Sequence, residues 1–423
     1  MHLIWVKVGG LWPANTGGRL RSLALIQELA QRHRITLLTT HGRHEDPDGL
    51  QAHLGPGVEV VSIAHEIPKR TSRTFPLALA RSWLTSDPVD LWRCRIPALR
   101  AALDDRLRRD TPDLCIADFL AAVPTVTFGG PVPVVVFSHN VEHMIWQRLA
   151  ATASNRITRG LLALEWRKMR RREVDACRRA TLTLTVSDPD RDRLAALAPS
   201  AHIQSIPTGV DLGYFTPRST DQDPDALVFV GSMDWYPNED GTLDFMATTL
   251  PLIRRARPST SFTIVGRNPS ARLREAAAAA GAAVTGTVDD VRPFLERAAV
   301  AVVPLRVGGG TRIKIFEALA MGKALVSTTI GAEGLPLTPG THYLQADQPE
   351  AFADHVLGLL RDPAARLALG QTGRQLVHQH YSWTHAAHVF ESACEEVVTR
   401  ASKRSRTRIR WMRDGRLPGE SRS

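Results

Sequence analysis

The feature that most constrains the fold of this chain is a regular alternation of short β-branched runs with helical stretches. In the first half the runs lie at 3–8, 34–40, 113–117, 132–138 and 180–187. In the second half they lie at 226–232, 261–266, 283–288, 300–305 and 324–330. Strands that alternate with helices are typical of parallel βαβ units. The pattern predicts an α/β protein with two doubly wound, Rossmann-like domains.

A segment rich in Pro, Gly and Asp interrupts the alternation and predicts a linker. It runs over 206–225, so the first domain is expected over 1–205 and the second over 226–385. We expect residues 386–400 to form a helix that packs back toward the first domain, and the basic residues 401–423 to form a disordered tail. Doubly wound sheets bind ligands at the carboxyl ends of their strands, which predicts a site in a cleft where the two domains face each other.

Length and composition agree with this organisation. The chain has 423 residues, enough for two domains of roughly 200 residues each. No apolar run reaches the roughly 18 residues of a membrane-spanning helix, and the N-terminus lacks the apolar core of a signal peptide, which favours the cytoplasm. The four cysteines are scattered, which favours buried thiols over a disulfide framework or a zinc site.

The net charge of +10 is concentrated in basic runs at 106–110, 165–179 and 402–416. No recognition-helix or single-strand-binding signature accompanies these runs, so we do not expect a nucleic-acid partner. Two interpretations of the middle run stay open: a solvated helix face, or attraction to an anionic membrane surface or an acidic lipid-linked substrate. Likewise, the stretch 81–100, with two tryptophans, fits either a membrane interface or a core helix.

Three consecutive glycines precede a helix predicted over 311–321, in the sequence GGGTRIKIFEALAMGK. The first N–H groups of a helix have no partner inside it and the helix dipole favours an anion, so this loop suits a phosphate. Arg312 and Lys314 add positive charge there. Glu317, at least one turn further on, has the oxygens to accept two hydrogen bonds from the vicinal hydroxyls of a sugar. These residues predict a nucleotide site; the alternative is a flexible loop with a surface pair of Lys314 and Glu317.

This stretch resembles the nucleotide-sugar-binding segment of retaining glycosyltransferases with the GT-B fold, glycosyltransferase family 4 (group 1). Five further motifs occur in the family's order: WPANTGGRLRSLALIQELAQRHRITLLT, FSHNVEHMIWQRL, VSDPDRDRL, IPTGVDLGYF and FVGSMDWYPNEDG. The resemblance covers residues 3 to about 395. It implies two Rossmann-like domains that face across a cleft, a nucleoside diphosphate sugar as donor, and a saccharide or lipid-linked saccharide as acceptor, in the synthesis of cell-surface polysaccharide or glycolipid.

The resemblance also implies roles for residues of the second domain. Glu317 would bind the donor ribose, and the backbone at Gly310 and Thr311 would lie near the donor phosphates. The family's motif has a first Glu eight residues before the second, and this position is Gly309 here. Backbone N–H groups would therefore replace the usual side-chain contact to the donor sugar.

A second departure concerns the cations that often follow the first strand of the family's second domain. The corresponding positions in this sequence lie in the region of Ser232 and Asn238. Positive charge for the diphosphate must then come from elsewhere, and the candidates are Arg312, Lys314 and Arg267.

In the first domain, Gly17 and Gly18 begin a predicted helix with Thr16 as a possible cap. This helix start also favours an anion, and the resemblance places it near the donor diphosphate with Arg19 or Arg21 beside it. The alternative is an ordinary capped helix with no ligand.

Four further candidates lie at or just after the carboxyl ends of first-domain strands. By resemblance, His139 contacts the transferred sugar, with Asn140 and Glu142 close by; a structural histidine is the alternative. Asp118 either positions the acceptor or caps the next helix.

The predicted reaction retains the anomeric configuration, with the acceptor attacking from the side that the diphosphate leaves. No carboxylate pair of the glycosidase kind stands out. The Asp pairs at 104–105 and 289–290 are better explained as helix-face and turn acids than as metal ligands, so we expect neither a metal nor another cofactor. Three rivals stay open: a nucleotide-sugar epimerase, a phosphorylase-like enzyme, and a non-catalytic subunit that binds a nucleotide sugar or a partner.

Overall fold

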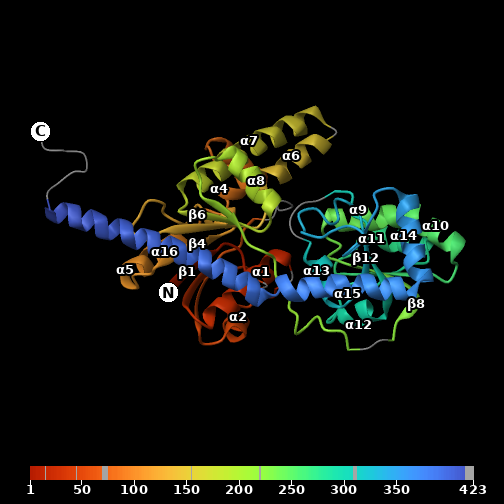
Figure 1. Cartoon of the computed structure of the whole chain (residues 1–423). Coiled ribbons are helices and arrows are strands. Elements are labelled where there is room, and N and C mark those ends of the chain that lie inside the picture. The colour runs from red at the N-terminus through yellow and green to blue at the C-terminus, as the bar shows by residue number, and fades with distance from the viewer. Residues whose placement is uncertain are drawn as a thin grey trace, which may run out of the picture. The chain divides into compact units, whose positions relative to one another are not determined.

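Two parallel β-sheets organise the chain in the computed structural model (Figure 1). One compact unit, unit 1, consists of Met1–Ile206 and Ala387–Ser423, and the other, unit 2, of Pro207–Ala386. The structure describes residues 1–14, 16–43, 45–68, 75–153, 155–218, 221–307 and 312–414, without the side chains of residues 152 and 404–414.

Unit 1 contains a seven-stranded sheet in the order β3-β2-β1-β4-β5-β6-β7. Every neighbouring pair runs parallel, as the alternation of elements predicted. The strands are β1 (His2–Lys7), β2 (Arg34–His41), β3 (Val58–Ala64), β4 (Leu114–Asp118), β5 (Val134–Ser138), β6 (Leu182–Thr185) and β7 (Ile203–Ser205). The strand order reverses between β1 and β4, which places the preferred ligand crevice at the ends of these two strands.

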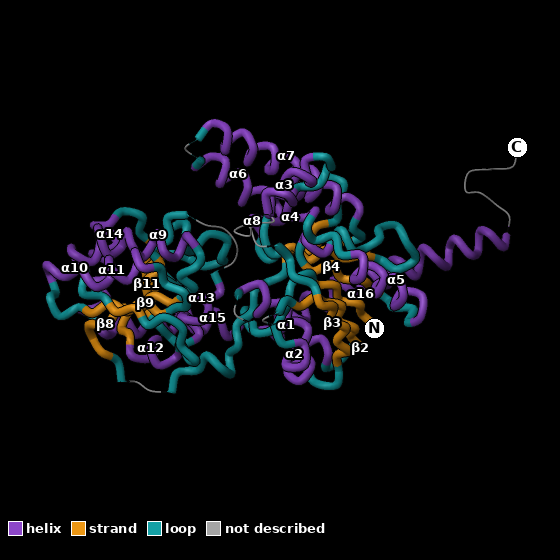
Figure 2. The backbone as a smooth tube through the Cα atoms, turned by 180° about the vertical axis from the view of Figure 1, so that it is seen from behind, coloured by secondary structure: helices purple, strands orange, loops and turns teal. Residues whose placement is uncertain are grey.

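Helices connect the strands of unit 1. They are α1 (Gly17–Ala30), α2 (Pro47–Leu54), α3 (Phe75–Trp83), α4 (Val89–Trp92), α5 (Pro97–Arg109), the 3₁₀ turn η1 (Leu120–Ala122), α6 (Glu142–Thr152), α7 (Arg156–Arg179) and α8 (Asp188–Leu197). Their starts carry the signals that the sequence leads one to expect: Thr16 accepts a hydrogen bond from the N–H of Arg19, and Ser187 caps α8. Both views show α6 and α7 lying side by side and extending away from the sheet of this unit (Figures 1 and 2).

Unit 2 contains a six-stranded parallel sheet in the order β10-β9-β8-β11-β12-β13. The strands are β8 (Asp223–Val230), β9 (Ser261–Val265), β10 (Ala283–Val284), β11 (Ala298–Val303), β12 (Ala324–Ser327) and β13 (Leu344–Gln345). The helices are α9 (Tyr236–Asp244), the π-helical turn η2 (Phe245–Thr249), α10 (Leu250–Ala256), α11 (Ala271–Ala279), α12 (Arg292–Arg297), α13 (Ile313–Ala320), α14 (Pro349–Arg361) and α15 (Pro363–His380). Here the order reverses between β8 and β11, so the loops after these strands form the corresponding crevice.

The last helix, α16 (Trp383–Asp414), begins in unit 2 and continues into unit 1. Phe390 stacks on Trp5 and meets Phe137 edge to face, so it belongs to the core of unit 1. Glu391 accepts hydrogen bonds from Arg32 at 2.8 Å and pairs with His33 at 2.6 Å. The N-terminal segment and this last helix therefore share one hydrophobic core.

The structure differs from the sequence-based expectation in several elements. Strands β3, β7 and β13 were not predicted, because they are short or only partly buried and lack a clean apolar run. Strand β8 begins inside the segment expected as linker. The tail was expected to be disordered from residue 401, whereas α16 continues to Asp414.

Candidate functional site

The glycine loop predicted to cradle a phosphate lies outside the described residues. This applies to the candidates Gly309, Gly310 and Thr311. The structure does describe both sides of the loop: β11, which precedes it, and α13, which follows it. The site is therefore built from α13 and the loops after β8 and β9.

Helix α13 presents Lys314 and Glu317 on one face, because these two residues are one turn apart. The opposite face, with Ile315, Phe316 and Leu319, is fully buried in the core of unit 2. Burial of that apolar face fixes the rotation of the helix. It therefore also fixes the direction in which the two charged side chains project.

Lys314 extends from α13 to the end of β8. Its Nζ donates to Oδ1 of Asn238 at 2.6 Å and lies 4.3 Å from the centre of the Phe229 ring. Gly231 makes this approach possible, because a Cβ at that position would lie 2.5 Å from Nζ. Burial and the nearby charge of Arg312 lower the pKa of Lys314 to about 7, although Glu317 acts in the opposite direction.

The Glu317 carboxylate makes no hydrogen bond to any other residue that the structure describes, although the side chain is half-buried. Burial raises its pKa to about 7, and the charge of Lys314 limits the shift. A half-buried carboxylate with unused acceptor oxygens is an uncommon and costly arrangement in a protein without a ligand. It suits an acceptor for ligand hydroxyls.

Arg267 lies on the loop after β9 and turns toward the loop after β8. Its Nε donates to Oγ of Ser232 at 2.7 Å, and its Nη2 lies 3.6 Å from a carboxylate oxygen of Asp234. Lys314 and Arg267 thus both reach the segment from Ser232 to Asn238. This is the segment where the sequence analysis found that the family's usual cations are missing, so two side chains from elsewhere in unit 2 bring positive charge to it.

Arg312 is the N-cap residue of α13 and is 3% exposed. Its Nη2 lies 3.5 Å from the carbonyl oxygen of Ile330, and its guanidinium lies 5.6 Å from the ring centre of Trp235. It thus holds the loop after β12 and the segment after β8 against the start of α13. Direct contact with a phosphate stays a prediction for Arg312.

In unit 1, Asp118 is the centre of a buried polar network at the switch point of the sheet. One carboxylate oxygen accepts from Nε1 of Trp5 at 2.9 Å, and the other lies 2.8 Å from Nε2 of His139 and 3.4 Å from Nζ of Lys7. Burial alone would raise its pKa, but Lys7 and His139 hold the pKa of Asp118 well below its ordinary value. The alternative role as a helix cap is not realised, because Phe119 is the residue that precedes η1.

His139 is also inside this network. The guanidinium of Arg21 can only donate, so the contact of 3.2 Å between its Nη1 and Nδ1 of His139 makes Nδ1 the acceptor. The proton then lies on Nε2, which donates to Asp118. Burial lowers the pKa of His139 to about 3, so the imidazole is neutral at pH 7. Both ring nitrogens are engaged, and a hydrogen bond from the ring to a sugar would require one of these bonds to break.

Aromatic packing ties this network to the start of α1. The Phe119 ring stacks on His139 with 3.7 Å between ring centres, and Nζ of Lys7 lies 3.5 Å from the centre of the same ring. Gly17 and Gly18 are the first residues of α1, and a Cβ on Gly18 would lie 2.6 Å from Cζ of Phe119. Gly18 is therefore required for packing. Arg19 forms an ion pair with Glu45 instead of joining the network.

Asn140 lies between β5 and α6, and Glu142 is the first residue of α6. The Ser138 hydroxyl donates to the carbonyl oxygen of Asn140 at 2.8 Å. Glu173, a buried residue of α7, accepts from the backbone N–H of Glu142 at 2.8 Å and from that of His143 at 3.2 Å. An acidic side chain thus satisfies the start of α6. This role of Glu173 was not predicted from the sequence, and neither were the roles of Trp5 and Lys7.

Among the described residues there is no cluster of three His, Cys, Asp or Glu side chains that could hold a metal ion. Three of the four aspartates in the Asp pairs noted in the sequence form ion pairs with arginines. Asp104 pairs with Arg100, Asp105 with Arg109, and Asp290 with Arg292.

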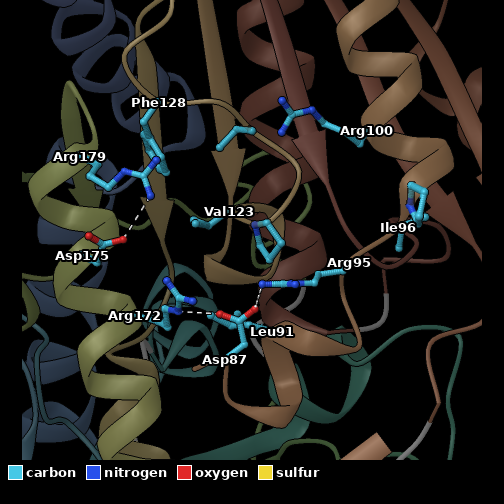
Figure 3. A pocket seen from close by; sticks show the side chains of 13 residues that line it. Asp87, Leu91, Arg95, Ile96, Arg100, Val123, Phe128, Arg172, Asp175 and Arg179 are labelled. Carbon is cyan, nitrogen blue, oxygen red and sulfur yellow. Dashed lines mark hydrogen bonds and ion pairs between the residues drawn. The ribbon is translucent and has the colours of Figure 1, made fainter. Parts of the chain in front are cut away.

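Unit 1 also contains a pocket of about 390 Å³ (Figure 3). Its wall combines apolar side chains with two aspartates and four arginines: Arg95, Arg100, Arg172 and Arg179. Each of them is paired with a carboxylate: Arg95 and Arg172 with Asp87, Arg100 with Asp104, and Arg179 with Asp175. Three carboxylates thus offset most of the charge of the four arginines within the protein, and we assign the pocket no ligand.

Two sequence profiles of known families match the chain. The profile described as "Glycosyltransferase Family 4" matches residues 15–214, and that described as "Glycosyl transferases group 1" matches residues 224–362. Among the described residues, no helix is both long enough and apolar enough to cross a membrane.

Two curated relatives are mannosyltransferases. The chain is 27% identical over 291 residues to the GDP-mannose-dependent alpha-(1-6)-phosphatidylinositol monomannoside mannosyltransferase of Mycolicibacterium smegmatis, a match that covers 62% of this chain and 73% of the relative. It is 26% identical over 201 residues to the GDP-mannose-dependent monoacylated alpha-(1-6)-phosphatidylinositol monomannoside mannosyltransferase of Corynebacterium glutamicum. That match covers 43% of this chain and 52% of the relative, so it spans about half the relative's length.

Solved structures show the same fold. Sucrose-phosphate synthase from Thermosynechococcus elongatus superposes with a TM-score of 0.71 at 15% identity, over 94% of this chain and 99% of that structure. Anabaena HepE, solved in complex with UDP, superposes with a TM-score of 0.65 at 12% identity, over 94% and 100%. At these identities the likeness shows the fold alone.

Proposed function

The chain belongs to the glycosyltransferases of family 4, group 1, with the GT-B fold, and from this premise we propose that it transfers a sugar from a nucleoside diphosphate sugar to an acceptor hydroxyl, with retention at the anomeric carbon. The observation that carries the proposal is the pair of Lys314 and Glu317, which lies at the switch point of the unit 2 sheet. The acceptor in this proposal is a glycolipid or a polysaccharide precursor.

The two side chains supply the two kinds of contact that a nucleoside diphosphate needs. Glu317 has carboxylate oxygens that no described residue uses, and these suit the vicinal hydroxyls of the ribose. Lys314, one turn nearer to the glycine loop, suits the diphosphate. Arg267 adds a second cation, and its Nε lies 2.7 Å from Oγ of Ser232. Because the pKa of Lys314 is about 7, an approaching diphosphate would raise that pKa and favour the charged ammonium.

In the proposed reaction, the bond between the anomeric carbon and the diphosphate oxygen breaks, and the acceptor oxygen forms a bond to the same face of that carbon. The acceptor proton passes to the departing diphosphate. Negative charge grows on the diphosphate in the transition state, so the cations near α13 lower the barrier by binding it there more strongly than in the ground state. The chemistry requires no metal ion.

The names of the relatives guide the choice of donor. The two mannosyltransferases are GDP-mannose-dependent, and their names give phosphatidylinositol monomannoside as acceptor. HepE has been solved with UDP. GDP-mannose with a phosphoinositide-linked mannoside is therefore the first donor and acceptor pair to test, and UDP-sugars are the second.

Thermal stabilisation by nucleotides tests the donor site directly, because a ligand that binds only the folded state raises the melting temperature. GDP, UDP, ADP and their sugar conjugates would be compared on the wild type and on Glu317→Ala. We expect one nucleoside diphosphate to stabilise the wild type, and its affinity to fall at least about tenfold in the variant, because the ribose loses a charged acceptor.

Glu275→Ala, an exposed change on α11, is the matched control and should bind as the wild type does. The donor that stabilises the protein would then be used in a transfer assay with a mannolipid acceptor, and the configuration of the product would be determined by NMR. If no nucleotide stabilised the protein, the assignment of the donor site to α13 would be wrong. Binding without transfer would favour a non-catalytic subunit.

A further inference from the structure

Exposed apolar side chains are concentrated on one part of unit 1. Among the described residues of this unit, eight large apolar side chains are exposed, and all of them lie on α6, on α7, or on α3 and the residue after it. On α7 they are Ile157, Leu161 and Leu164, which are spaced by four and three residues and so lie on one face of the helix. Ile157 is 74% exposed.

Helix α6 carries a similar apolar stripe, formed by Ile145 and Leu149. The two helices pack together as a hairpin (Figure 1), with Trp146 of α6 in the same core cluster as Leu162 of α7. On α6, the exposed Ile145 comes one position before Trp146, which faces the core. On α7, the exposed Leu161 comes one position before Leu162, which also faces the core. Because the helices are antiparallel, this shared offset turns both stripes to the same side of the hairpin. We call this side the hairpin face.

The end of α3 extends the hairpin face. Lys168, one turn after Leu164 on α7, donates from Nζ to the carbonyl oxygen of Ser82 at 3.0 Å. The next two residues, Trp83 and Leu84, are 39% and 89% exposed. The apolar surface therefore continues from α7 onto the end of α3, with a cation between the two parts.

The charge around the hairpin face is strongly positive. Helix α7 contains nine Lys and Arg residues and three acids, and two of these acids, Glu165 and Glu173, are buried. Arg167, Arg170 and Arg171 are exposed on the part of α7 that follows the apolar stripe. Apolar side chains beside a dense group of arginines are typical of a surface that inserts shallowly into a membrane with anionic headgroups.

We propose that the hairpin face docks unit 1 on the surface of an anionic phospholipid bilayer. The apolar side chains of α6, α7 and the end of α3 enter the headgroup region, and the arginines of α7 contact lipid phosphates. Charge complementarity is the reason for choosing a bilayer over a protein partner, because a largely unbalanced cluster of arginines beside an apolar stripe would be costly to bury in a protein interface. The proposal deepens the proposed function, since a glycolipid acceptor lies in such a surface. Of the two interpretations left open for the middle basic run, the proposal adopts the membrane surface.

Co-sedimentation of the full-length protein with vesicles tests this. Vesicles of phosphatidylcholine alone would be compared with vesicles that contain about 30% phosphatidylglycerol, without any nucleotide. We expect binding to the anionic vesicles only, weakened by added salt. Ile157→Ser and the double variant Leu161→Ser/Leu164→Ser should each lower the affinity, the double variant by at least about tenfold.

Leu367→Ser is the matched control, because Leu367 is 59% exposed on α15 of unit 2 and should not affect vesicle binding. Ile157→Ser keeps the test valid if the double variant misfolds, because so exposed a side chain contributes little to the core.

If the wild type bound neither vesicle, or if the hairpin variants bound as the wild type does, the proposal would be wrong. A dimer in analytical ultracentrifugation that Ile157→Ser dissociates, without vesicle binding, would overturn it in favour of a second copy of the chain. Donor binding is measured separately by thermal stabilisation, so each proposal can fail while the other holds.

Discussion

Lys314 and Glu317 change protonation in the same pH range, because burial moves the two pKa values toward each other. The pKa of the lysine falls to about 7 and that of the glutamate rises to about 7. Arg312 caps the same helix and its charge acts on Lys314, while Arg267 and Asp234 pair with each other in the loops after β9 and β8. A ligand that needs both the ammonium and the carboxylate will therefore bind best near pH 7.

This gives a prediction for Lys314→Met. A nucleotide sugar carries a diphosphate that does not titrate near neutrality, so pH acts on the protein alone. Between pH 7 and 8 the protonated fraction of Lys314 falls, and the Kd of the wild type should rise about fivefold. Lys314→Met should bind at least about tenfold more weakly and should lose this alkaline dependence. Isothermal titration calorimetry over pH 6–9 measures the Kd of the wild type and of the variant. Glu317→Gln should keep the alkaline dependence and should lose only the weakening of binding that the wild type shows below pH 7. An unchanged alkaline limb in Lys314→Met would rule out a role for this lysine.

Asp118 leads to a prediction about stability. Its side chain is fully buried and holds Lys7, so Asp118→Asn leaves a buried cation without a counter-ion. We expect a loss of about 3 kcal/mol in the free energy of unfolding at pH 7. The pKa of Asp118 is lowered in the folded state, so its contribution is complete above the ordinary value of 3.8 and is lost as pH falls further. The difference between wild type and variant should therefore shrink below about pH 4.

Urea unfolding at several pH values measures this difference. Asp104→Asn, a partly exposed change on α5, is the control and should cost less than about 1 kcal/mol. A pH-independent penalty for Asp118→Asn would show that the charge of Asp118 is not what stabilises unit 1.

At the residue scale, the sequence could single out Glu317 as a candidate because the helix pattern fixes its distance from the glycine loop, and its role in binding stays a prediction. The sequence did not identify Lys7 or Trp5 as partners of Asp118. These contacts join residues more than 100 positions apart and depend on the pairing of β1 with β4. One signal was available: a lysine and a tryptophan inside an otherwise aliphatic strand, LIWVKV, need polar partners when that strand is central and buried.

At the scale of the elements, two glycines in the loops after β8 and β9 have different tolerances. A Cβ on Gly266 would lie 1.7 Å from the carbonyl oxygen of Gly231, which is rigid backbone. A Cβ on Gly231 would instead meet the end of the Lys314 side chain at 2.5 Å. Backbone cannot give way without moving a strand, whereas a lysine side chain can rotate.

Gly266→Ala should therefore lower the free energy of unfolding by about 2 kcal/mol or more, through displacement of the loops after β8 and β9. Gly231→Ala should cost less than about 1 kcal/mol but should weaken nucleotide binding at least about tenfold, because it displaces Lys314. Thermal melting with and without the donor nucleotide separates the two effects. Equal effects of the two substitutions on stability would contradict this account.

The parallel sheets were predictable at this scale because buried parallel strands are continuous apolar runs. The ends of the strands were not. Strand β10 was expected over 283–288 but ends at Val284, since Gly286 turns the chain with a φ of 72°. Strand β3, VEVVSIA, carries charged and polar residues and is the edge strand next to β2 in the described sheet, so it lacks the apolar signature of a central strand.

At the scale of the whole molecule, the chain enters unit 2 after Ile206 and returns to unit 1 at Ala387. Unit 1 therefore cannot complete its core until the residues after Ala387 have been made. Phe390, Ala393, Cys394 and Val397 of α16 are all buried, and Phe390 fills the space between Trp5 and Phe137. The sequence analysis expected residues 386–400 to form a helix, but its exact partners depend on the finished sheet.

Truncation tests this dependence. A chain that ends at residue 386 loses the aromatic contacts of Phe390 and the ion pair of Glu391 with Arg32. Removal of one large buried aromatic side chain alone costs about 3–5 kcal/mol, a large part of the stability of a typical domain, so we expect this truncated chain not to fold stably in unit 1. A chain that ends at residue 403 keeps these contacts and should melt within a few degrees of the full-length protein. Phe390→Ala, with an intact chain, should fall between the two. Equal melting of both truncated chains would show that α16 contributes nothing to unit 1, and would contradict the shared core from which this prediction follows.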